Sequence, residues 1–246
     1  MAEGPHVAVL RPDDGRLEAT ADYLRSLGAE PVPDAMLSVE PTGTAPREDG
    51  DITVFTSTTG ARLAGARDWT PTETDIVAIG PSTAAGLREN GYGVTLIPSQ
   101  YSSAGLVSAL AERAPGQRIE VARSDHGSPT LTEGLADAGG YVHETVLYRL
   151  ARPEEAGASA VMAAAGDLDG ILFTSSLTVE HFLEAAADRG VRPEAVAALN
   201  EEVIVGVIGE PTREQAAAMG LSVDAVPETA DIEALAEAVI ERIRPE

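Results

Sequence analysis

Short apolar runs alternate along the chain with segments in which apolar residues recur at the spacing of an α-helix. Buried parallel strands are short and almost wholly apolar, whereas helices that cover a sheet are amphipathic. The apolar runs predict strands at His6–Leu10, Asp51–Phe55, Asp75–Ile79, Val94–Ile97, Ile119–Ala122, Tyr141–Leu150, Gly170–Phe173, Val203–Ile208 and Val223–Val226. The amphipathic segments predict helices at Arg16–Leu27, Ser102–Arg113, Pro129–Ala138, Leu177–Arg189, Thr212–Met219 and Asp231–Arg242, with another after each of Phe55 and Ile79. This alternation predicts an α/β fold with parallel sheets covered on both faces.

Proline and glycine mark the connections between these elements. Pro31–Val39 contains two prolines, which predicts a broken strand or a linker. Pro41–Gly50 and Ala151–Gly157 are rich in proline, glycine and polar residues, and they are the stretches most typical of linkers.

The element pattern restarts near the middle of the chain, and we interpret the restart as an internal duplication. The corresponding segments are Val7–Gly15 with Ile119–Gly127, Leu24–Val32 with Leu135–His143, Val54–Thr59 with Leu172–Leu177, and Ile79–Leu87 with Ile208–Ala216. Each copy holds about five strands, the size of one flavodoxin-like domain. The sequence therefore predicts two small parallel-sheet domains rather than one large one.

The composition is strongly acidic. The 246 residues carry a formal net charge of −23, and all 17 basic residues are arginine. The acidic residues are spread over the whole chain, which favours a protein adapted to molar salt, where charge repulsion is screened within about 3 Å. An ordinary acidic enzyme is the alternative. Because no basic stripe could neutralise phosphates, we expect no nucleic-acid partner.

Several classes of site are absent from the sequence. The chain has no cysteine, its four histidines show no metal-ligand spacing, and no phosphate-binding loop of the G-x-x-x-x-G-K type occurs. We therefore expect no metal and no cofactor. No apolar run is long enough to span a membrane, and residues Met1 to Gly4 lead directly into a strand pattern, so we expect a soluble, cytoplasmic protein without a membrane partner.

Small hydroxyl residues and glycines follow the predicted strands, where parallel α/β sheets bind their ligands. These segments are Thr56-Ser57, Gly80-Pro81-Ser82-Thr83, Thr174-Ser175-Ser176 and Gly209-Glu210-Pro211-Thr212. Such residues cap helices in many proteins, and capping explains any one of them. Their recurrence in both copies favours a ligand site, because free amides at helix N-termini suit carboxylates or phosphates.

Three larger side chains are further candidates. Arg11 and Arg123 follow the first strand of each copy and could clamp anions, or pair with Asp13 or Asp125 as surface charges. Tyr148 lies late in a long strand, where it could pack in the core or donate a proton to a leaving group.

In these motifs the chain resembles the uroporphyrinogen-III synthases. The resemblance is carried by "IGPSTAAGL", its second copy "IGEPT", "FTS", "FTSS", "SSAGL" (Ser102–Leu106) and "TVLYRL" (Thr145–Leu150), in this family's order and spacing over nearly the whole chain. It implies two α/β domains joined by a two-stranded linker, with a cleft between them. By that pattern, residues 1–37 and 152–246 form a discontinuous domain into which residues 38–151 are inserted.

The resemblance also implies an activity and a set of site residues. The family cyclises hydroxymethylbilane to uroporphyrinogen III, inverting the last pyrrole ring and losing water, without a cofactor. Tyr148 matches the tyrosine proposed to help hydroxide leave. Thr83 and Thr212 match the threonines of the family's two "IG-x-x-T" turns, and Ser57 and Ser175 match the serines after "FT". The further residues expected to bind substrate, from their positions at the predicted strand ends, are Arg11, Ser103, Arg123, Ser176 and Gly209. The pair Glu210-Pro211 departs from the neutral pair that relatives often carry. We expect a monomer.

A two-domain binding protein for a small anionic metabolite is the alternative from another functional class. It would share the sheets and the helix N-termini but perform no chemistry. Tyr148 separates the two hypotheses, because a binding protein has no need of that hydroxyl.

Overall fold

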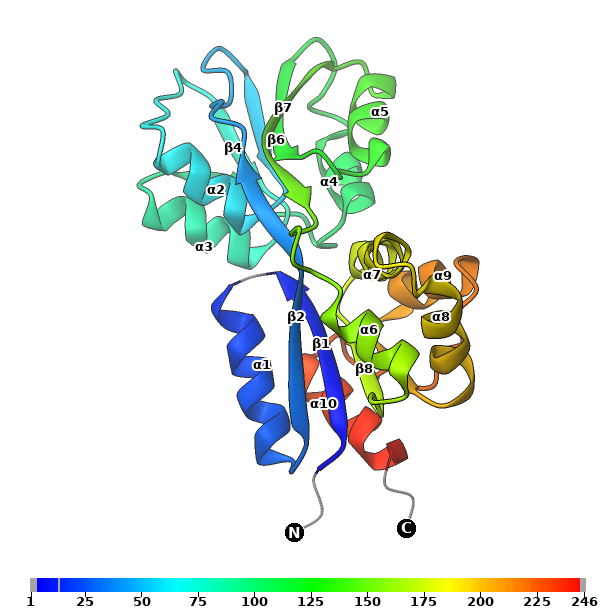
Figure 1. Cartoon of the computed structure of the whole chain (residues 1–246). Helices are drawn as coiled ribbons and strands as arrows, with labels where there is room; N and C mark the ends of the chain where they lie inside the picture. Colours follow the sequence, from blue (N-terminus) through cyan, green and yellow to red (C-terminus); the bar gives the residue numbers. More distant parts are fainter. Residues whose placement is uncertain (1–3, 13, 244–246) are drawn as a thin grey trace. The chain divides into compact units, whose positions relative to one another are not determined.

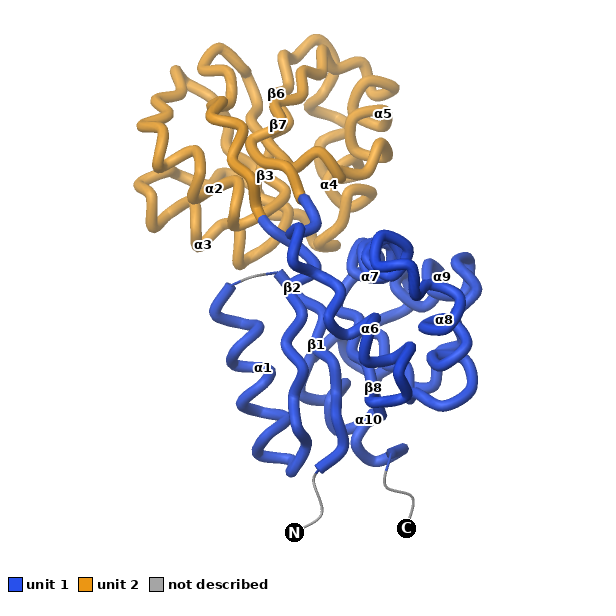
Figure 2. The backbone as a smooth tube through the Cα atoms, viewed as in Figure 1, with its two compact units in different colours: residues 1–38, 151–246 blue, residues 39–150 orange. Residues whose placement is uncertain are grey.

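The computed structural model describes residues 4–12 and 14–243, and they form two compact units (Figure 2). Unit 1 comprises Met1–Ser38 and Ala151–Glu246, and unit 2 comprises Val39–Leu150. The long strands β2 (Glu30–Pro41) and β7 (Tyr141–Ala151) carry the chain from one unit to the other, and they are neighbours in the strand order. Whether each unit folds as an independent domain stays a prediction.

Unit 1 is built on a parallel sheet in the order β2-β1-β8-β9 (Figure 1). Its other strands are β1 (His6–Pro12), β8 (Gly170–Phe173) and β9 (Ile204–Val207). Its helices are α1 (Gly15–Ser26), α6 (Ala158–Ala165), α7 (Ser176–Asp188), α8 (Arg192–Glu201), α9 (Glu210–Ala218) and α10 (Ile232–Ile243).

Unit 2 is built on a parallel sheet in the order β5-β4-β3-β6-β7. Its other strands are β3 (Ile52–Phe55), β4 (Asp75–Ala78), β5 (Val94–Leu96) and β6 (Arg118–Ser124). Its helices are α2 (Thr58–Gly65), α3 (Pro81–Glu89), α4 (Ser103–Leu110) and α5 (Pro129–Asp137). The predicted α/β class with parallel sheets is confirmed in both units.

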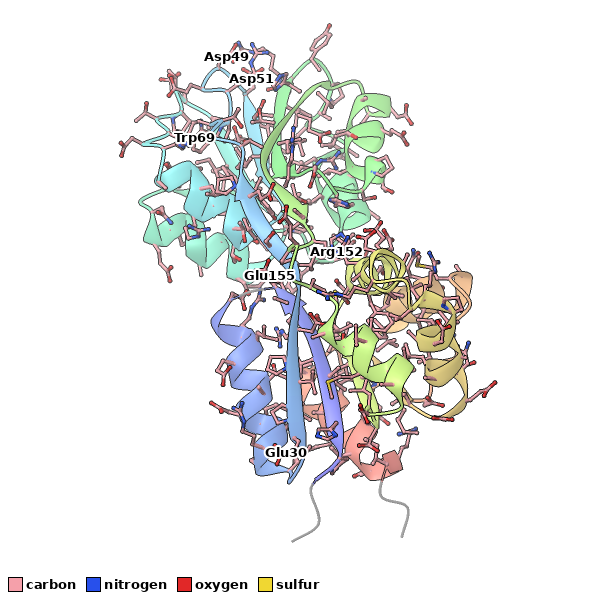
Figure 3. The ribbon with its side chains drawn as sticks, in the orientation of Figure 1. Glu30, Asp49, Asp51, Trp69, Arg152 and Glu155 are labelled. Carbon is pink, nitrogen blue, oxygen red and sulfur yellow. The ribbon has the colours of Figure 1, made fainter. Side chains whose placement is uncertain are left out.

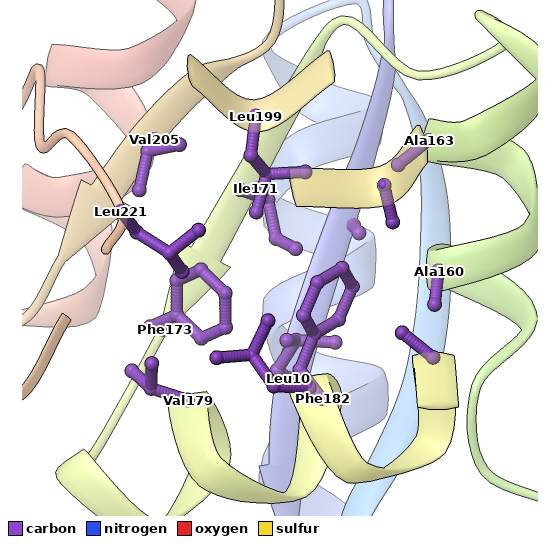
Figure 4. Close-up of a cluster of buried hydrophobic side chains, with 14 of the residues drawn as sticks. Leu10, Ala160, Ala163, Ile171, Phe173, Val179, Phe182, Leu199, Val205 and Leu221 are labelled. Atoms are coloured by element: carbon purple, nitrogen blue, oxygen red, sulfur yellow. The ribbon is translucent and has the colours of Figure 1, made fainter. Parts of the chain in front are cut away.

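Each sheet buries apolar side chains on both faces, as its apolar strands require. In unit 1 one face packs against α6 to α9, where Phe173 and Phe182 meet edge to face at 5.6 Å (Figure 4). The other face packs against α1 and α10. In unit 2 the α2 and α3 face is centred on Phe55 and Trp69, which also meet edge to face, at 5.5 Å.

The two sheets have the same strand order once the chain is read from different starting points. Unit 2 runs β5-β4-β3-β6-β7, and unit 1 in reverse runs β9-β8-β1-β2. Outside β9, at the place that β5 has in unit 2, Ala225 forms a bridge to Gly206. β3 therefore corresponds to β8, β4 to β9, β6 to β1 and β7 to β2. These are the pairs that the sequence duplication matched, so the duplication along the chain is repeated in the spatial order of the strands.

Three sequence predictions need correction. Pro31–Val39 is not broken but belongs to the continuous strand β2, which tolerates its prolines because in unit 1 it is an edge strand. Val223–Val226 forms only the isolated bridge at Ala225. Helices α6 and α8 were not predicted, because α6 is mostly alanine and shows little contrast between its faces.

Candidate active site

Ser57 caps the helix that follows the first strand of unit 2. β3 ends at Phe55, and Ser57 has an extended backbone, so its hydroxyl oxygen accepts a hydrogen bond from the amide of Gly60 at 3.0 Å. This is the usual N-cap contact. It fixes the hydroxyl at the carboxyl edge of the sheet, between β3 and β6, where the direction of the strand order changes. Ligands of doubly wound sheets bind at such an edge.

Tyr148 reaches the same hydroxyl from β7. Its phenol donates a hydrogen bond to Ser57 Oγ at 2.9 Å, and its side chain is otherwise buried against the α2 and α3 face, with 6% of the residue exposed. Tyr148 therefore packs in the core and also presents its hydroxyl at the strand ends. That it donates a proton to a leaving group stays a prediction.

The turn from β4 into α3 lies beside Ser57 in the sheet order. Gly80 is the N-cap of α3, Pro81 opens the helix, and Thr83 is buried in its first turn. A groove of about 490 Å³ lies between α2 and α3. It is lined by Thr58, Thr59, Arg62, Ser82, Ala85, Gly86, Glu89 and Asn90. Thr58, Thr59 and Arg62 were not among the residues expected from the sequence, although the position of the two threonines just after a strand was a signal.

Ser103 is the first residue of α4, and its neighbour Ser102 is the N-cap. The Ser102 hydroxyl accepts from the amide of Gly105 at 3.0 Å, which repeats the Ser57 contact. The Ser103 side chain is half-buried and is not part of that cap.

Unit 1 presents the corresponding edge with different partners. Ser175 caps α7 in a reciprocal capping box with Thr178, and the Ser176 hydroxyl donates to the carbonyl of Pro211 at 3.1 Å. Gly209 is the N-cap of α9, and Thr212 is buried in its first turn. These contacts hold the helix N-termini that follow β8 and β9 against each other.

The acidic residue of this turn is already paired. Glu210 accepts a hydrogen bond from Arg213 Nε at 2.9 Å, and that contact lowers the pKa of the Glu210 carboxyl. The pair is exposed, and the Arg213 guanidinium offsets the charge of Glu210 in the first turn of the helix. Glu210 is therefore a weaker obstacle to a carboxylate ligand than its charge alone indicates.

Only some of the backbone amides at the N-termini of α3 and α9 are free to bind a ligand. Proline supplies no N–H at Pro81 in α3 and at Pro211 in α9. The amide of Thr212 donates to the carbonyl of Gly209 at 3.1 Å. The first-turn amides left for a ligand are those of Ser82 and Thr83 in α3 and that of Glu210 in α9.

Arg123 is a buried structural charge. Its side chain is 6% exposed, Nη2 lies 2.7 Å from Glu144 Oε2, and Nη1 donates to the carbonyl of Ser128 at 2.6 Å. It thus pairs with Glu144 and not with Asp125, whose carboxylate contacts His126 and the amide of Leu150. Neither of the two alternatives that the sequence left open describes it well.

Arg11, unlike Arg123, has no carboxylate hydrogen-bonded to it among the described residues. Nη1 donates to Thr20 Oγ1 at 3.0 Å, while Nε is buried without a partner among the described residues, which do not include Asp13. Burial lowers the pKa of the Arg11 guanidinium, Arg16 lowers it further, and Asp14 opposes them. Arg11 lines a pocket of about 210 Å³ together with Arg16, Tyr23 and residues of α10. An anion in that pocket would compensate the charge.

Within the part of the chain that the structure describes, no group of three or more histidines, aspartates or glutamates is arranged to hold a metal ion. The helices described there include none that is long and apolar enough to cross a membrane.

A family model described as "Uroporphyrinogen-III synthase HemD" matches residues 18–237. The chain belongs to the uroporphyrinogen-III synthase family. A Methanothermobacter thermautotrophicus relative is 32% identical over 141 residues, which are 56% of this chain and 54% of that protein. The uroporphyrinogen-III synthase of Chlorobaculum parvum is 27% identical over 175 residues, 70% of this chain and 68% of that one. The match to the Methanothermobacter protein therefore spans only about half of that protein's length.

A solved member of this family has the same fold. The crystal structure of a mutant uroporphyrinogen III synthase from Thermus thermophilus matches with a TM-score of 0.69 and 20% identity, covering 96% of this chain and 98% of that one. At this identity the likeness establishes the two-unit α/β fold. It confirms the fold that the family resemblance implied.

Proposed function

We propose that this protein is a uroporphyrinogen-III synthase, a lyase that cyclises hydroxymethylbilane to uroporphyrinogen III in tetrapyrrole biosynthesis, the route to heme. The family match over residues 18–237 carries the proposal. The hydroxyl pair formed by Tyr148 and Ser57 at the carboxyl edge of unit 2 supports it, because the reaction begins with loss of a hydroxyl group.

The substrate carries many carboxylates, and the edge residues of both units offer groups that bind them. In unit 2 these are Ser57, Thr83 and Ser103, with Arg62 in the neighbouring groove. In unit 1 they are Ser175, Ser176, Gly209, Thr212 and Arg11. Arg123 supports the edge of unit 2 from inside, through its bond to the Ser128 carbonyl, rather than by contacting substrate.

The site offers hydroxyls, amides and guanidinium groups rather than a strong acid or base, and the reaction requires no more. The electrons of the terminal pyrrole expel the hydroxyl group, so no strong acid or base is required. The enzyme must hold a flexible tetrapyrrole so that the substituted carbon of the last ring attacks. Positioning of this kind supplies several kcal/mol toward lowering a barrier. Hydroxyls, amides and a few guanidinium groups are sufficient for it.

We further propose that the protein works as a monomer in a cytoplasm of high salt, and that its two units are domains. The net charge of −23 without a single lysine supports the salt adaptation. The two compact units support the division into domains. Light scattering on a size-exclusion column in molar KCl tests the oligomeric state, and limited proteolysis near Val39 and Leu150 tests the division.

The decisive experiment is to supply hydroxymethylbilane, generated in place by its own synthase, and to identify the uroporphyrinogen isomer. We expect isomer III, in amounts that scale with the protein. Without an active synthase the substrate closes spontaneously to isomer I. Isomer I alone, from protein that binds the tetrapyrrole, would instead favour a binding protein.

A further inference from the structure

We propose that Ser57, and not Tyr148, delivers the proton to the departing hydroxyl group, and that Tyr148 acts through Ser57. This proposal rests on the proposed synthase activity. It follows from counting the hydrogens and lone pairs at the single oxygen atom that the two residues share.

Ser57 Oγ accepts two hydrogen bonds. One comes from the amide of Gly60 at 3.0 Å, and the other from the phenol of Tyr148 at 2.9 Å. A hydroxyl oxygen has two acceptor sites and one proton to donate. Both acceptor sites are therefore filled from within unit 2, and the only hydrogen-bonding capacity left to Ser57 is its own proton.

The phenol of Tyr148 is in the opposite situation. Its proton is already donated to Ser57, and the residue is 6% exposed. Ser57 is half-buried at the start of α2, next to Thr58, which lines the groove between α2 and α3. A ligand at this edge thus meets the serine hydroxyl first, with the tyrosine behind it.

The different acidities of the two hydroxyl groups explain why they are paired. An aliphatic alcohol is a much weaker acid than a phenol, so serine alone is a poor proton donor. When Ser57 gives its proton while taking the proton of Tyr148, the negative charge ends on the phenol oxygen rather than on an alkoxide. Hydrogen-bonded chains of this kind polarise one another in a site of low dielectric.

The bond between the hydroxymethyl carbon and its oxygen breaks, and the oxygen leaves with the bonding electrons while the pyrrole nitrogen donates electron density to the carbon. The leaving oxygen takes the Ser57 proton and becomes water, and Ser57 takes the Tyr148 proton. The last ring first bonds through its substituted carbon, which carries no hydrogen. The old bridge bond to that carbon then breaks and re-forms at the unsubstituted α-carbon of the same ring, which loses its proton as the pyrrole regains aromaticity. That proton restores Tyr148, so the net change is loss of water from the substrate.

The corresponding position in unit 1 lacks this device. Ser175 is the equivalent N-cap, but it is engaged in a capping box with Thr178, and a leucine, Leu37, stands where unit 2 has Tyr148. The structure thus assigns proton delivery to the carboxyl edge of unit 2, and leaves binding to that of unit 1.

Single-turnover rates for Ser57→Gly, Tyr148→Phe and the double variant test the proposal. Glycine is a good N-cap, so Ser57→Gly removes the hydroxyl while α2 stays capped. We expect each single variant to lower kcat about tenfold, with KM little changed, and the double variant to lose no more than either one. We also expect the slowing of the wild-type reaction in D₂O to disappear in both single variants, and Ser57→Thr to restore rate and isotope effect.

Ser102→Gly is the matched control, because Ser102 makes the same 3.0 Å cap contact in the same unit without a tyrosine behind it. We expect it to keep the wild-type rate and isotope effect. A wild-type rate for Ser57→Gly beside a slow Tyr148→Phe would overturn the proposal in favour of direct donation by the phenol. Additive losses of about a hundredfold in the double variant would overturn it too. If wild-type protein forms no isomer III, the proposed function itself fails instead.

Discussion

Tyr148 and Leu37 occupy equivalent positions in the two copies of the duplicated sheet. Tyr148 on β7 pairs with Ser124 directly after a register shift in β6, and Leu37 on β2 pairs with Pro12 directly after a register shift in β1. Even the irregularity of the strand pairing is repeated. The copies differ in what they place there, a phenol bound to Ser57 in one and an apolar side chain in the other. The two copies share the backbone arrangement at this position, but of the two only unit 2 has the hydroxyl pair there.

Replacing Arg123 by methionine should destabilise the protein. The substitution leaves the Ser128 carbonyl and the partly exposed Glu144 without their partner, and the loss costs about 1–3 kcal/mol. Urea unfolding at fixed KCl measures the change in the free energy of unfolding. The double variant Arg123→Met, Glu144→Gln should recover part of the loss, because no unpaired charge remains. An unchanged urea midpoint for Arg123→Met would show that the pair contributes nothing.

The sequence was a good guide to contacts within a few residues and a poor guide to contacts across the sheet. Ser102 as an N-cap could be predicted, because a hydroxyl just before an amphipathic segment bonds an amide three residues on. The bond between Tyr148 and Ser57 joins residues 91 positions apart, and the ion pair between Arg123 and Glu144 depends on the register of β6 and β7. No local pattern encodes such a register.

The same limit explains why α6 was missed. Its first-turn amides are capped by Asp34, which lies on β2 and accepts from the amides of Gly157 and Ser159 and from the Ser159 hydroxyl. The capping residue is thus more than a hundred positions upstream, and the residue just before the helix is glycine. An N-cap search along the chain finds no signal there.

Asp34→Asn should therefore destabilise unit 1. Asparagine retains one acceptor oxygen but points an NH₂ group at amides that also donate, so at least one buried donor loses its partner. We expect a loss of about 1–3 kcal/mol in the free energy of unfolding. Hydrogen exchange should localise the effect to the first turn of α6. Asp167→Asn, at an exposed position of the same unit, is the control and should leave both measurements unchanged.

The ion pair between Asp51 and Arg118, at the end of unit 2 where β3 begins (Figure 3), should contribute to acid sensitivity. The side chain of Arg118, with help from its backbone amide, lowers the pKa of Asp51 to about 2 from 3.8. A carboxylate with a lowered folded-state pKa stabilises the fold above its unfolded pKa. That stability is lost as the pH falls from about 4 through about 2.

Carboxyl NMR titration of Arg118→Gln checks this directly. We expect the Asp51 pKa to rise toward its ordinary value without reaching it, because the backbone amide bond at 2.8 Å remains. Arg113→Gln breaks the separate pair with Asp75 and should leave the pKa of Asp51 unchanged. If Arg118→Gln also leaves the pKa of Asp51 unchanged, the ion pair between Asp51 and Arg118 is not formed in solution.

The melting temperature should rise steeply between low and molar KCl. With a net charge of −23, mutual repulsion weakens the fold when the screening length is long. A variant with Glu30→Gln, Glu112→Gln and Glu154→Gln, all exposed positions, removes three negative charges and should flatten the dependence on salt. Thermal scans of both proteins across a KCl series measure it. A melting temperature indifferent to KCl would exclude salt adaptation without touching the proposed activity.

So acidic a protein must bind a polycarboxylate against its own net charge. The net field repels the substrate, so affinity must come from local groups. Arg11 is suited to this role because its guanidinium lacks a carboxylate partner among the described residues and lines a pocket. A charge-assisted hydrogen bond contributes about 1.5–3 kcal/mol, so Arg11→Met should weaken uroporphyrinogen III binding by about ten- to a hundredfold.

Arg25→Gln is the control for the charge alone. It removes the same charge from the same unit, but Arg25 is already paired with Glu18 and Asp22 and does not line the pocket. Titration calorimetry with product at several KCl concentrations should show a large loss for Arg11→Met and almost none for Arg25→Gln. In the wild type, molar KCl screens the net repulsion as well as the local attraction, so affinity should change little as KCl rises. Equal losses in the two variants would mean that only total charge matters, and that the pocket beside Arg11 does not bind substrate.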